Sequence, residues 1–199
     1  VAGTYGVAVH PNIEQVYATT KFANVLQSVF VNDVSEDFVA DLTVENSVVV
    51  TNGTFGNDFG RGIAFNSEGT RAYVAYRAPP SLLVVDTAVG VDGRPANRVL
   101  NTIPMGNGPA EVVVAPSGPG GRELVYVSAY SANQIYVVDP LLMVVIDVID
   151  TGEGPYSMAV VKNDDRFRLY VSLFGAHSIG VIELDETTGF YHQEIARVP

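Results

Sequence analysis

Short apolar runs alternate along this chain with clusters of Gly, Pro, Asn and Asp, and no window keeps a helical period for long. Four of these runs begin at a Tyr, and the Tyr residues are spaced 56, 53 and 44 residues apart: Tyr17, Tyr73, Tyr126 and Tyr170. Runs of this length that are rich in Val and Tyr predict β-strands. A recurrence of roughly 50 residues indicates an internal structural repeat.

The residues that follow each Tyr keep the same register. Nine residues after each Tyr stands an aliphatic residue: Leu26, Leu82, Ile135 and Ile179. Twelve residues after it stands Val or Ile: Val29, Val85, Val138 and Ile182. Thirteen residues after it stands Phe30 in the first repeat and an acid in the other three: Asp86, Asp139 and Glu183. A further apolar segment precedes each Tyr, and a fourth segment closes each repeat at 47–50, 98–103, 144–149 and 193–198. Four short strands separated by turn-forming residues predict a four-stranded antiparallel sheet, which is one blade of a β-propeller.

The predicted fold is therefore all-β, a propeller of about four blades at 1–55, 56–105, 106–151 and 152–199. Four blades use up all 199 residues. An open arc of blades would expose apolar faces at both ends, so three explanations compete. The chain is part of a larger ring, it closes alone, or it pairs with another chain to complete a ring. We favour the first, a partial or processed chain.

Several motifs give the repeat a family resemblance. They are the Tyr-Val-Ser element, the Gly-Pro pairs 108–109 and 154–155, and the run from Asn133 to Asp139. Together they resemble the YVTN-type β-propeller repeat, most closely over 106–185, recognisably over 56–105 and loosely over 1–55. The resemblance implies a seven-bladed ring related to surface-layer-like proteins of the cell exterior, to lactonase-like propellers, or to propeller subunits of periplasmic dehydrogenases.

Composition narrows the function classes. The formal charge is −11, and no segment supplies the basic stripe that nucleic acid requires. The absence of Cys excludes thiol catalysis, iron–sulfur clusters and covalently attached haem from the chain itself. The longest apolar run, 141–146, is far shorter than the roughly 20 residues of a membrane span. We expect no cofactor and no membrane span.

Candidate binding residues come from the loops, because propellers gather ligands where the loops after strand two and before strand one converge near the axis. Four residues after each Tyr stand Lys21, Arg77, Tyr130 and Phe174, and seven residues after it stand Asn24, Pro80, Asn133 and His177. Cations, aromatic rings and amides gathered at one mouth of the ring suit an anionic or carbohydrate-like ligand, or a protein partner that uses Tyr and Arg anchors. Ordinary solvated loop side chains are the alternative.

Other titratable residues offer less. The three His residues, His10, His177 and His192, occupy different places in the repeat and do not have the spacing of a zinc site. The acids that end the third strand are expected to accept hydrogen bonds in turns. Ser128 and Ser172 lie inside strand two without a neighbouring base, so we predict no catalytic residue.

Taken together, these patterns predict a non-catalytic binding or scaffold module. It would lie outside the cytoplasm, as an extracellular (secreted), cell-surface or periplasmic protein, and present its loop face to a protein or a cell-surface polymer. A lactonase-like hydrolase, or a propeller subunit of a periplasmic oxidoreductase complex, is the alternative.

Overall fold

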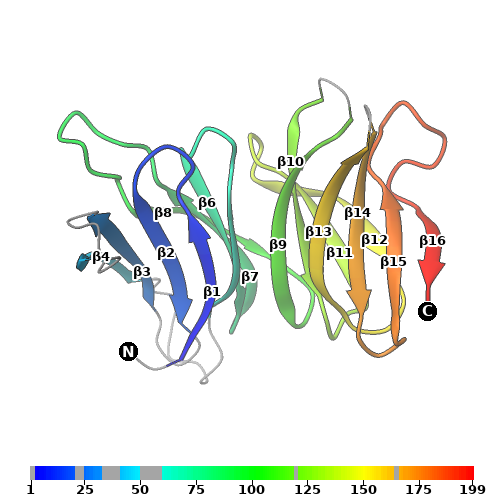
Figure 1. Ribbon diagram of the computed structural model, residues 1–199. Coiled ribbons are helices and arrows are strands. Elements are labelled where there is room, and N and C mark those ends of the chain that lie inside the picture. Colours follow the sequence, from blue (N-terminus) through cyan, green and yellow to red (C-terminus); the bar gives the residue numbers. More distant parts are fainter. Residues whose placement is uncertain (1–2, 21–24, 33–40, 50–59, 119–120, 164–165) are drawn as a thin grey trace.

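The computed structural model describes residues 3–20, 25–32, 41–49, 60–118, 121–163 and 166–199. Within these residues every regular element is a β-strand, and the strands form four antiparallel sheets of four strands each (Figure 1). The first two sheets are β1 (Thr4–Val9), β2 (Gln15–Thr20), β3 (Val25–Asn32) and β4 (Asp41–Val49), then β5 (Gly60–Phe65), β6 (Arg71–Arg77), β7 (Pro80–Asp86) and β8 (Arg98–Pro104). The other two are β9 (Pro109–Pro116), β10 (Glu123–Ala129), β11 (Gln134–Asp139) and β12 (Val144–Asp150), then β13 (Pro155–Asn163), β14 (Arg166–Leu173), β15 (Ser178–Glu183) and β16 (Glu194–Val198).

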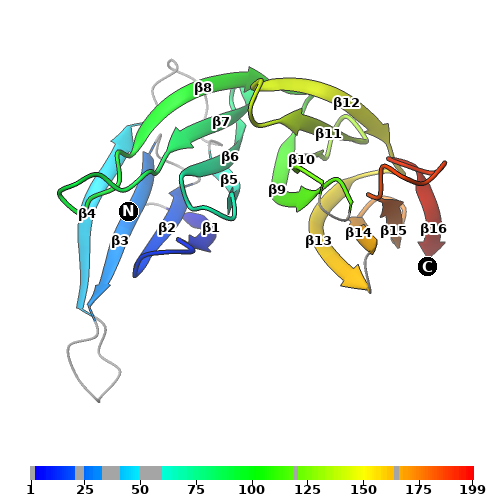
Figure 2. The same cartoon turned by 90° about the horizontal axis from the view of Figure 1, so that it is seen from above.

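Each sheet pairs its strands in chain order, as a propeller blade does. Seen from above, the first strands of the blades, β1, β5, β9 and β13, line the concave side, and the fourth strands form the outer rim (Figure 2). The blades follow one another along an arc that is open between the first blade and the last. The predicted all-β propeller fold is confirmed, as an arc of four blades and not a closed ring.

The repeated Tyr residues lie between blades. Tyr17, Tyr73 and Tyr126 are 0–1% exposed, and each is associated with a residue that stands one or two positions before the fourth strand of the following blade. The hydroxyl of Tyr17 donates to Asn97 Oδ1 at 2.6 Å, and that of Tyr126 lies 3.1 Å from His192 Nε2. Met143 packs with Tyr73 in one apolar cluster. These three partner residues share a left-handed backbone, with φ of 48° at Asn97, 55° at Met143 and 56° at His192.

A second link between blades comes from a hydroxyl two residues after the Tyr. Thr19 Oγ1 donates to the carbonyl of Arg61 in the next blade at 2.5 Å, and Ser128 Oγ donates to the carbonyl of Tyr156 at 2.7 Å. The serine of the Tyr-Val-Ser element therefore has a structural role.

The acids at the end of strand three close turns, as the sequence predicts. Asp139 Oδ1 accepts the backbone N–H groups of Leu141 at 2.8 Å and Leu142 at 3.0 Å. Asp86 accepts the N–H of Ala88 at 3.1 Å. Hydrogen bonds of this kind satisfy backbone N–H groups of the turn that have no partner within the sheet.

Candidate ligand-binding mouth

The first strand of every blade carries a β-bulge near its start. Two residues of the inner strand lie opposite one residue of its neighbour: Tyr5-Gly6, Arg61-Gly62, Ala110-Glu111 and Tyr156-Ser157. A bulge bends the strand and changes where its side chains point. Three of the four bulges place a large side chain, Tyr5, Arg61 or Tyr156, at the mouth where the inner strands begin.

A cavity of about 540 Å³ lies at this mouth. Three of its lining residues are the bulge residues just named, and the other three stand four positions after the repeated Tyr residues: Tyr5, Arg61 and Tyr156, then Arg77, Tyr130 and Phe174. The cavity therefore draws on all four blades, from the starts of β1, β5 and β13 and from the ends of β6, β10 and β14.

Two guanidinium groups give the cavity a positive charge. The guanidinium of Arg61 lies over the ring of Tyr5, 4.4 Å from its centre. Arg77 Nε donates to the carbonyl of Pro109 at 3.0 Å, which holds the side chain in place. Burial lowers the pKa of both groups, and the charge of Arg77 lowers the pKa of Arg61 further. None of the six lining residues is acidic, so a bound anion would relieve the repulsion between the two arginines.

Aromatic rings form the remaining walls. Tyr130 meets Tyr156 edge to face with ring centres 5.9 Å apart, and Phe174 lies 6.3 Å from Tyr130. The hydroxyls of Tyr5 and Tyr156 are hydrogen-bonded, so side chains of the first and fourth blades meet across the mouth. Phe174 is 69% exposed and stands at the rim. Rings arranged in this way offer flat apolar contacts beside a charged group.

The structure brings together Arg77, Tyr130 and Phe174 of the residues predicted from the sequence. Lys21 and Asn24 lie outside the described residues. Asn133 and His177, seven residues after the Tyr, do not line the cavity.

Asn133 and His177 both occupy turns with a left-handed backbone, at φ of 58° and 49°. Asn133 Oδ1 accepts the N–H of Gly154 at 3.0 Å, which ties the turn to the next blade. Asn133 also borders a smaller hollow of about 380 Å³ beside Tyr130.

Sequence reasoning missed Tyr5, Arg61 and Tyr156. Their signal is their place directly after the first residue of the inner strand, which in the third and fourth blades is the Pro of the Gly-Pro pair. Reading the repeat backward from the Tyr to this position would have found them, although the bulge itself leaves no mark in the sequence.

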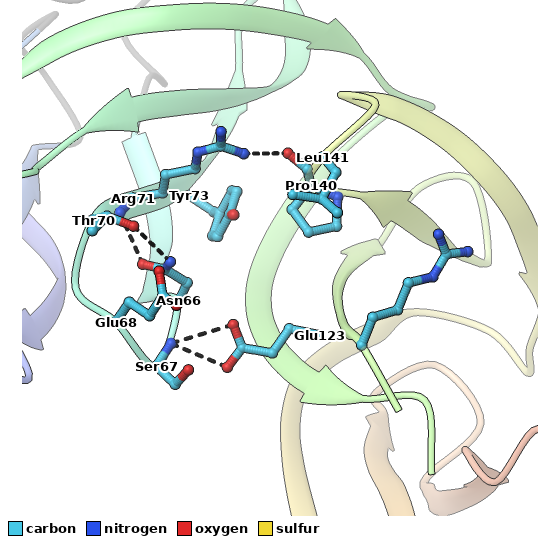
Figure 3. Close-up of a pocket in the computed structure, with 10 residues that line it drawn as sticks. Asn66, Ser67, Glu68, Thr70, Arg71, Tyr73, Glu123, Pro140 and Leu141 are labelled. Carbon is cyan, nitrogen blue, oxygen red and sulfur yellow. Dashed lines mark hydrogen bonds between the residues drawn. The ribbon is translucent and has the colours of Figure 1, made fainter. Parts of the chain in front are cut away.

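A second cavity, of about 340 Å³, lies between the second and third blades at the opposite end of the strands (Figure 3). Two of its charged side chains, those of Arg71 and Glu123, already serve the contact between the blades. Arg71 donates to the carbonyl of Pro140, and the carboxylate of Glu123 accepts the N–H of Ser67 at 3.1 Å. This arrangement explains how the blades are joined and leaves the mouth as the better candidate for a ligand.

Two further observations concern metals and membranes. Among the residues that the structure describes, no three His, Asp or Glu side chains gather as a metal site would require. His10 instead packs at the joint between the first two blades, with its ring centre 5.1 Å from that of Phe65. In the described part of the chain, no helix is long and apolar enough to cross a membrane.

No protein-family model and no curated protein sequence matches the chain. Solved structures do resemble it. Hydrazine synthase from Kuenenia stuttgartiensis aligns with 100% of this chain and 49% of its own, at 16% identity and a TM-score of 0.71. A putative 6-phosphogluconolactonase from Bacteroides fragilis aligns with 98% of this chain and 54% of its own, at 18% identity and a TM-score of 0.70.

The periplasmic gluconolactonase of Pseudomonas aeruginosa also resembles the chain, at 16% identity and a TM-score of 0.62, over 86% of this chain and 43% of its own. The chain thus spans about half the length of these proteins. At such identities the likeness supports the propeller fold and leaves the activity open.

Proposed function

We propose that this chain is a binding module of a propeller protein that acts outside the cytoplasm, and that its mouth cavity receives an acidic sugar unit of a cell-surface polymer. The observation that carries the proposal is that two arginines and four aromatic rings line one cavity. These six side chains come from all four blades, and none of them is acidic.

The arginines account for the acidic part of the ligand. A guanidinium offers parallel N–H donors that match a carboxylate, and such charge-assisted hydrogen bonds are stronger than neutral ones. The chain as a whole is strongly acidic, with a formal charge of −11. That charge repels a long polyanion, so recognition would concentrate on one or a few units at the mouth.

The aromatic walls account for the ring of the ligand. Phe174 at the rim and Tyr130 inside present flat faces to a cyclic body, while the tyrosine hydroxyls add hydrogen-bonding groups. The cavity volume of about 540 Å³ lies in the range of small-molecule sites.

Binding has more support than catalysis. The six lining side chains include no carboxylate, imidazole or aliphatic hydroxyl that would activate water or form a covalent intermediate. The alternative function, a lactonase-like hydrolase or a propeller subunit of a periplasmic oxidoreductase complex, is supported only by the shared fold of lactonases and hydrazine synthase. One of these proteins is a periplasmic gluconolactonase, which agrees with a place outside the cytoplasm.

Isothermal titration with trigalacturonate, a short acidic sugar, tests the proposal, and neutral maltotriose is the control ligand. We expect binding of trigalacturonate only. Arg77→Gln should weaken it at least about tenfold, since a hydrogen bond to a charged group contributes about 1.5–3 kcal/mol. Phe174→Ala should weaken it as well, and its exposed position leaves the fold intact.

Arg98→Gln is the matched control, because Arg98 is exposed and pairs with Asp86 away from the cavity. Equal affinity for both sugars, or wild-type affinity in Arg77→Gln, would remove the mouth as an acidic-sugar site. Binding of a protein instead, with no response to either sugar, would also overturn the proposal.

A further inference from the structure

The smaller hollow beside Tyr130 adjoins the mouth cavity and shares one of its walls. We call it the side hollow, and it has a volume of about 380 Å³. It lies at the joint between the third and fourth blades, where the turns after β10 and β14 meet the segment before β13. Its lining residues are Tyr130, Ser131, Asn133, Glu153, Gly154 and Gly175. Tyr130 also lines the mouth cavity, so the two spaces meet at one tyrosine.

Hydrogen bonds between the two blades fix the turns that form the side hollow. Asn133 Oδ1 accepts the N–H of Gly154 at 3.0 Å. The N–H of Gly175 donates to the carbonyl of Glu153 at 3.0 Å, and that of Phe174 donates to the carbonyl of Gly154 at 2.8 Å. A ligand would therefore meet a backbone that is already ordered, which lowers the entropic cost of binding.

Two glycines keep the side hollow open. Gly154 has a left-handed backbone with φ of 68°, and a Cβ atom there would lie 3.0 Å from the ring of Tyr130. A Cβ atom on Gly175 would lie 2.9 Å from the Cβ atom of Glu153. A side chain at either position would push against a residue that lines the hollow, so glycine preserves its shape.

The polar groups of the side hollow suit the hydroxyls of a sugar. Ser131, Asn133 and Glu153 are all exposed. Among the residues that the structure describes, the hydroxyl of Ser131, Nδ2 of Asn133 and the carboxylate of Glu153 make no hydrogen bond or ion pair. A sugar hydroxyl both donates and accepts, and these three groups offer a carboxylate acceptor, an amide donor and a hydroxyl.

The two neighbouring spaces differ in charge. The mouth cavity is lined by Arg61 and Arg77 and by no acid, whereas the only charged side chain that lines the side hollow is Glu153. An acidic sugar is attracted to the first space, but its carboxylate would be repelled by Glu153 in the second. Hydroxyls of a neutral sugar can instead donate to Glu153, in charge-assisted hydrogen bonds.

We propose that the side hollow is a second subsite, and that the ligand is a polymer in which acidic and neutral sugars alternate. The inference rests on the proposed function, because it assigns the acidic unit to the mouth cavity. The neutral unit lies in the side hollow, where its hydroxyls donate to Glu153 and accept from Asn133. Tyr130 stands where the two units join. A polymer of acidic units alone binds through the mouth cavity only.

Isothermal titration with two tetrasaccharides tests the proposal. One is a hyaluronan tetrasaccharide, in which glucuronate alternates with neutral N-acetylglucosamine, and the other is tetragalacturonate, in which every unit is acidic. We expect the wild-type chain to bind the alternating tetrasaccharide more than about tenfold tighter, since only this ligand gains charge-assisted hydrogen bonds in the side hollow.

Glu153→Gln should reduce that preference from both sides. It should weaken binding of the alternating tetrasaccharide at least about threefold, because a neutral amide replaces the charged acceptor. It should tighten binding of tetragalacturonate about two- to fivefold, because the repulsion is removed. Asn133→Asp keeps an oxygen for the N–H of Gly154 and removes the amide donor, so it should weaken the alternating tetrasaccharide at least about threefold as well.

Glu186→Gln is the matched control, because it makes the same change of net charge. Glu186 is exposed in the loop between β15 and β16, at the end of the strands opposite the mouth, and both affinities should stay at wild-type values. Equal affinity of the wild-type chain for the two tetrasaccharides would overturn the second subsite, as would a Glu153→Gln variant that behaves like Glu186→Gln. If Arg77→Gln still weakens binding of tetragalacturonate in those cases, the proposed function stands without the second subsite. Failure of the wild-type chain to bind either ligand would overturn both.

Discussion

The hydroxyl link between blades gives a sharp energetic test in the replacement Ser128→Ala. Ser128 is fully buried, and its hydroxyl accepts the N–H of Glu111 at 3.0 Å while it donates to the carbonyl of Tyr156 at 2.7 Å. The alanine variant removes two hydrogen bonds and leaves two backbone groups without this partner. At about 1 kcal/mol for each bond, the free energy of unfolding should fall by about 2 kcal/mol.

The chain offers its own control for this loss. Ser172 occupies the same position in the last blade, where its hydroxyl bonds only within that blade and near solvent. Ser172→Ala should therefore cost less than about 1 kcal/mol in the single chain, because water replaces the lost contacts.

Urea titration followed by far-ultraviolet circular dichroism measures both values, at a dilution where the chain is monomeric. For a protein of this size, a loss of about 2 kcal/mol corresponds to a melting temperature about 4–8 °C lower. Equal losses for Ser128→Ala and Ser172→Ala would refute the reasoning, because it assigns the difference to the joint between blades.

Two further predictions use other joint residues. Burial lowers the pKa of His192 below its usual 6.5, although its hydrogen bond to Asp147 acts in the opposite direction. As the pH falls, the unfolded chain therefore binds the proton before the folded chain does. The contribution of His192 to the free energy of unfolding is complete above pH 6.5 and should decline as the pH falls below it. His192→Gln should flatten that decline in urea midpoints measured between about pH 8 and pH 5, and an unchanged slope would exclude His192 as its source. Ile135→Ala should cost about 2–5 kcal/mol because its side chain is fully buried, whereas Ile179→Ala in the single chain should cost less than about 1 kcal/mol. Similar losses of stability for the two variants in thermal melts would contradict this reasoning, because it assigns Ile135 to a joint between blades and Ile179 to an exposed face of the last blade.

Much of the fold could be predicted from the sequence because the repeat keeps its register. The Tyr and the aliphatic residue nine positions later recur where blades meet, so each repeat needs a large apolar side chain at these two positions. In the second, third and fourth blades the position four residues after the Tyr lies at the end of strand two, at the same mouth, which is why Arg77, Tyr130 and Phe174 share a cavity.

The other half of the site escaped prediction for a physical reason. The bulge inserts one residue into an otherwise alternating strand, so the side chains of Tyr5, Arg61 and Tyr156 do not follow the two-residue period. The turn at Asn133 escaped for a different reason. The sequence places Asn133 at a loop position without indicating its left-handed backbone or its hydrogen bond from the N–H of Gly154, which give it a place in the turn.

The contacts of the repeated Tyr residues have a consequence for how the chain matures during synthesis. The hydroxyl of Tyr17 meets a residue 80 positions later, Asn97, and that of Tyr126 meets His192, 66 positions later. The strands of one blade are close in sequence and can pair early, whereas these contacts must await almost the whole of the next blade. Each newly made blade therefore lacks these contacts until the next blade has emerged from the ribosome, and its tertiary packing is completed about one blade later than its synthesis.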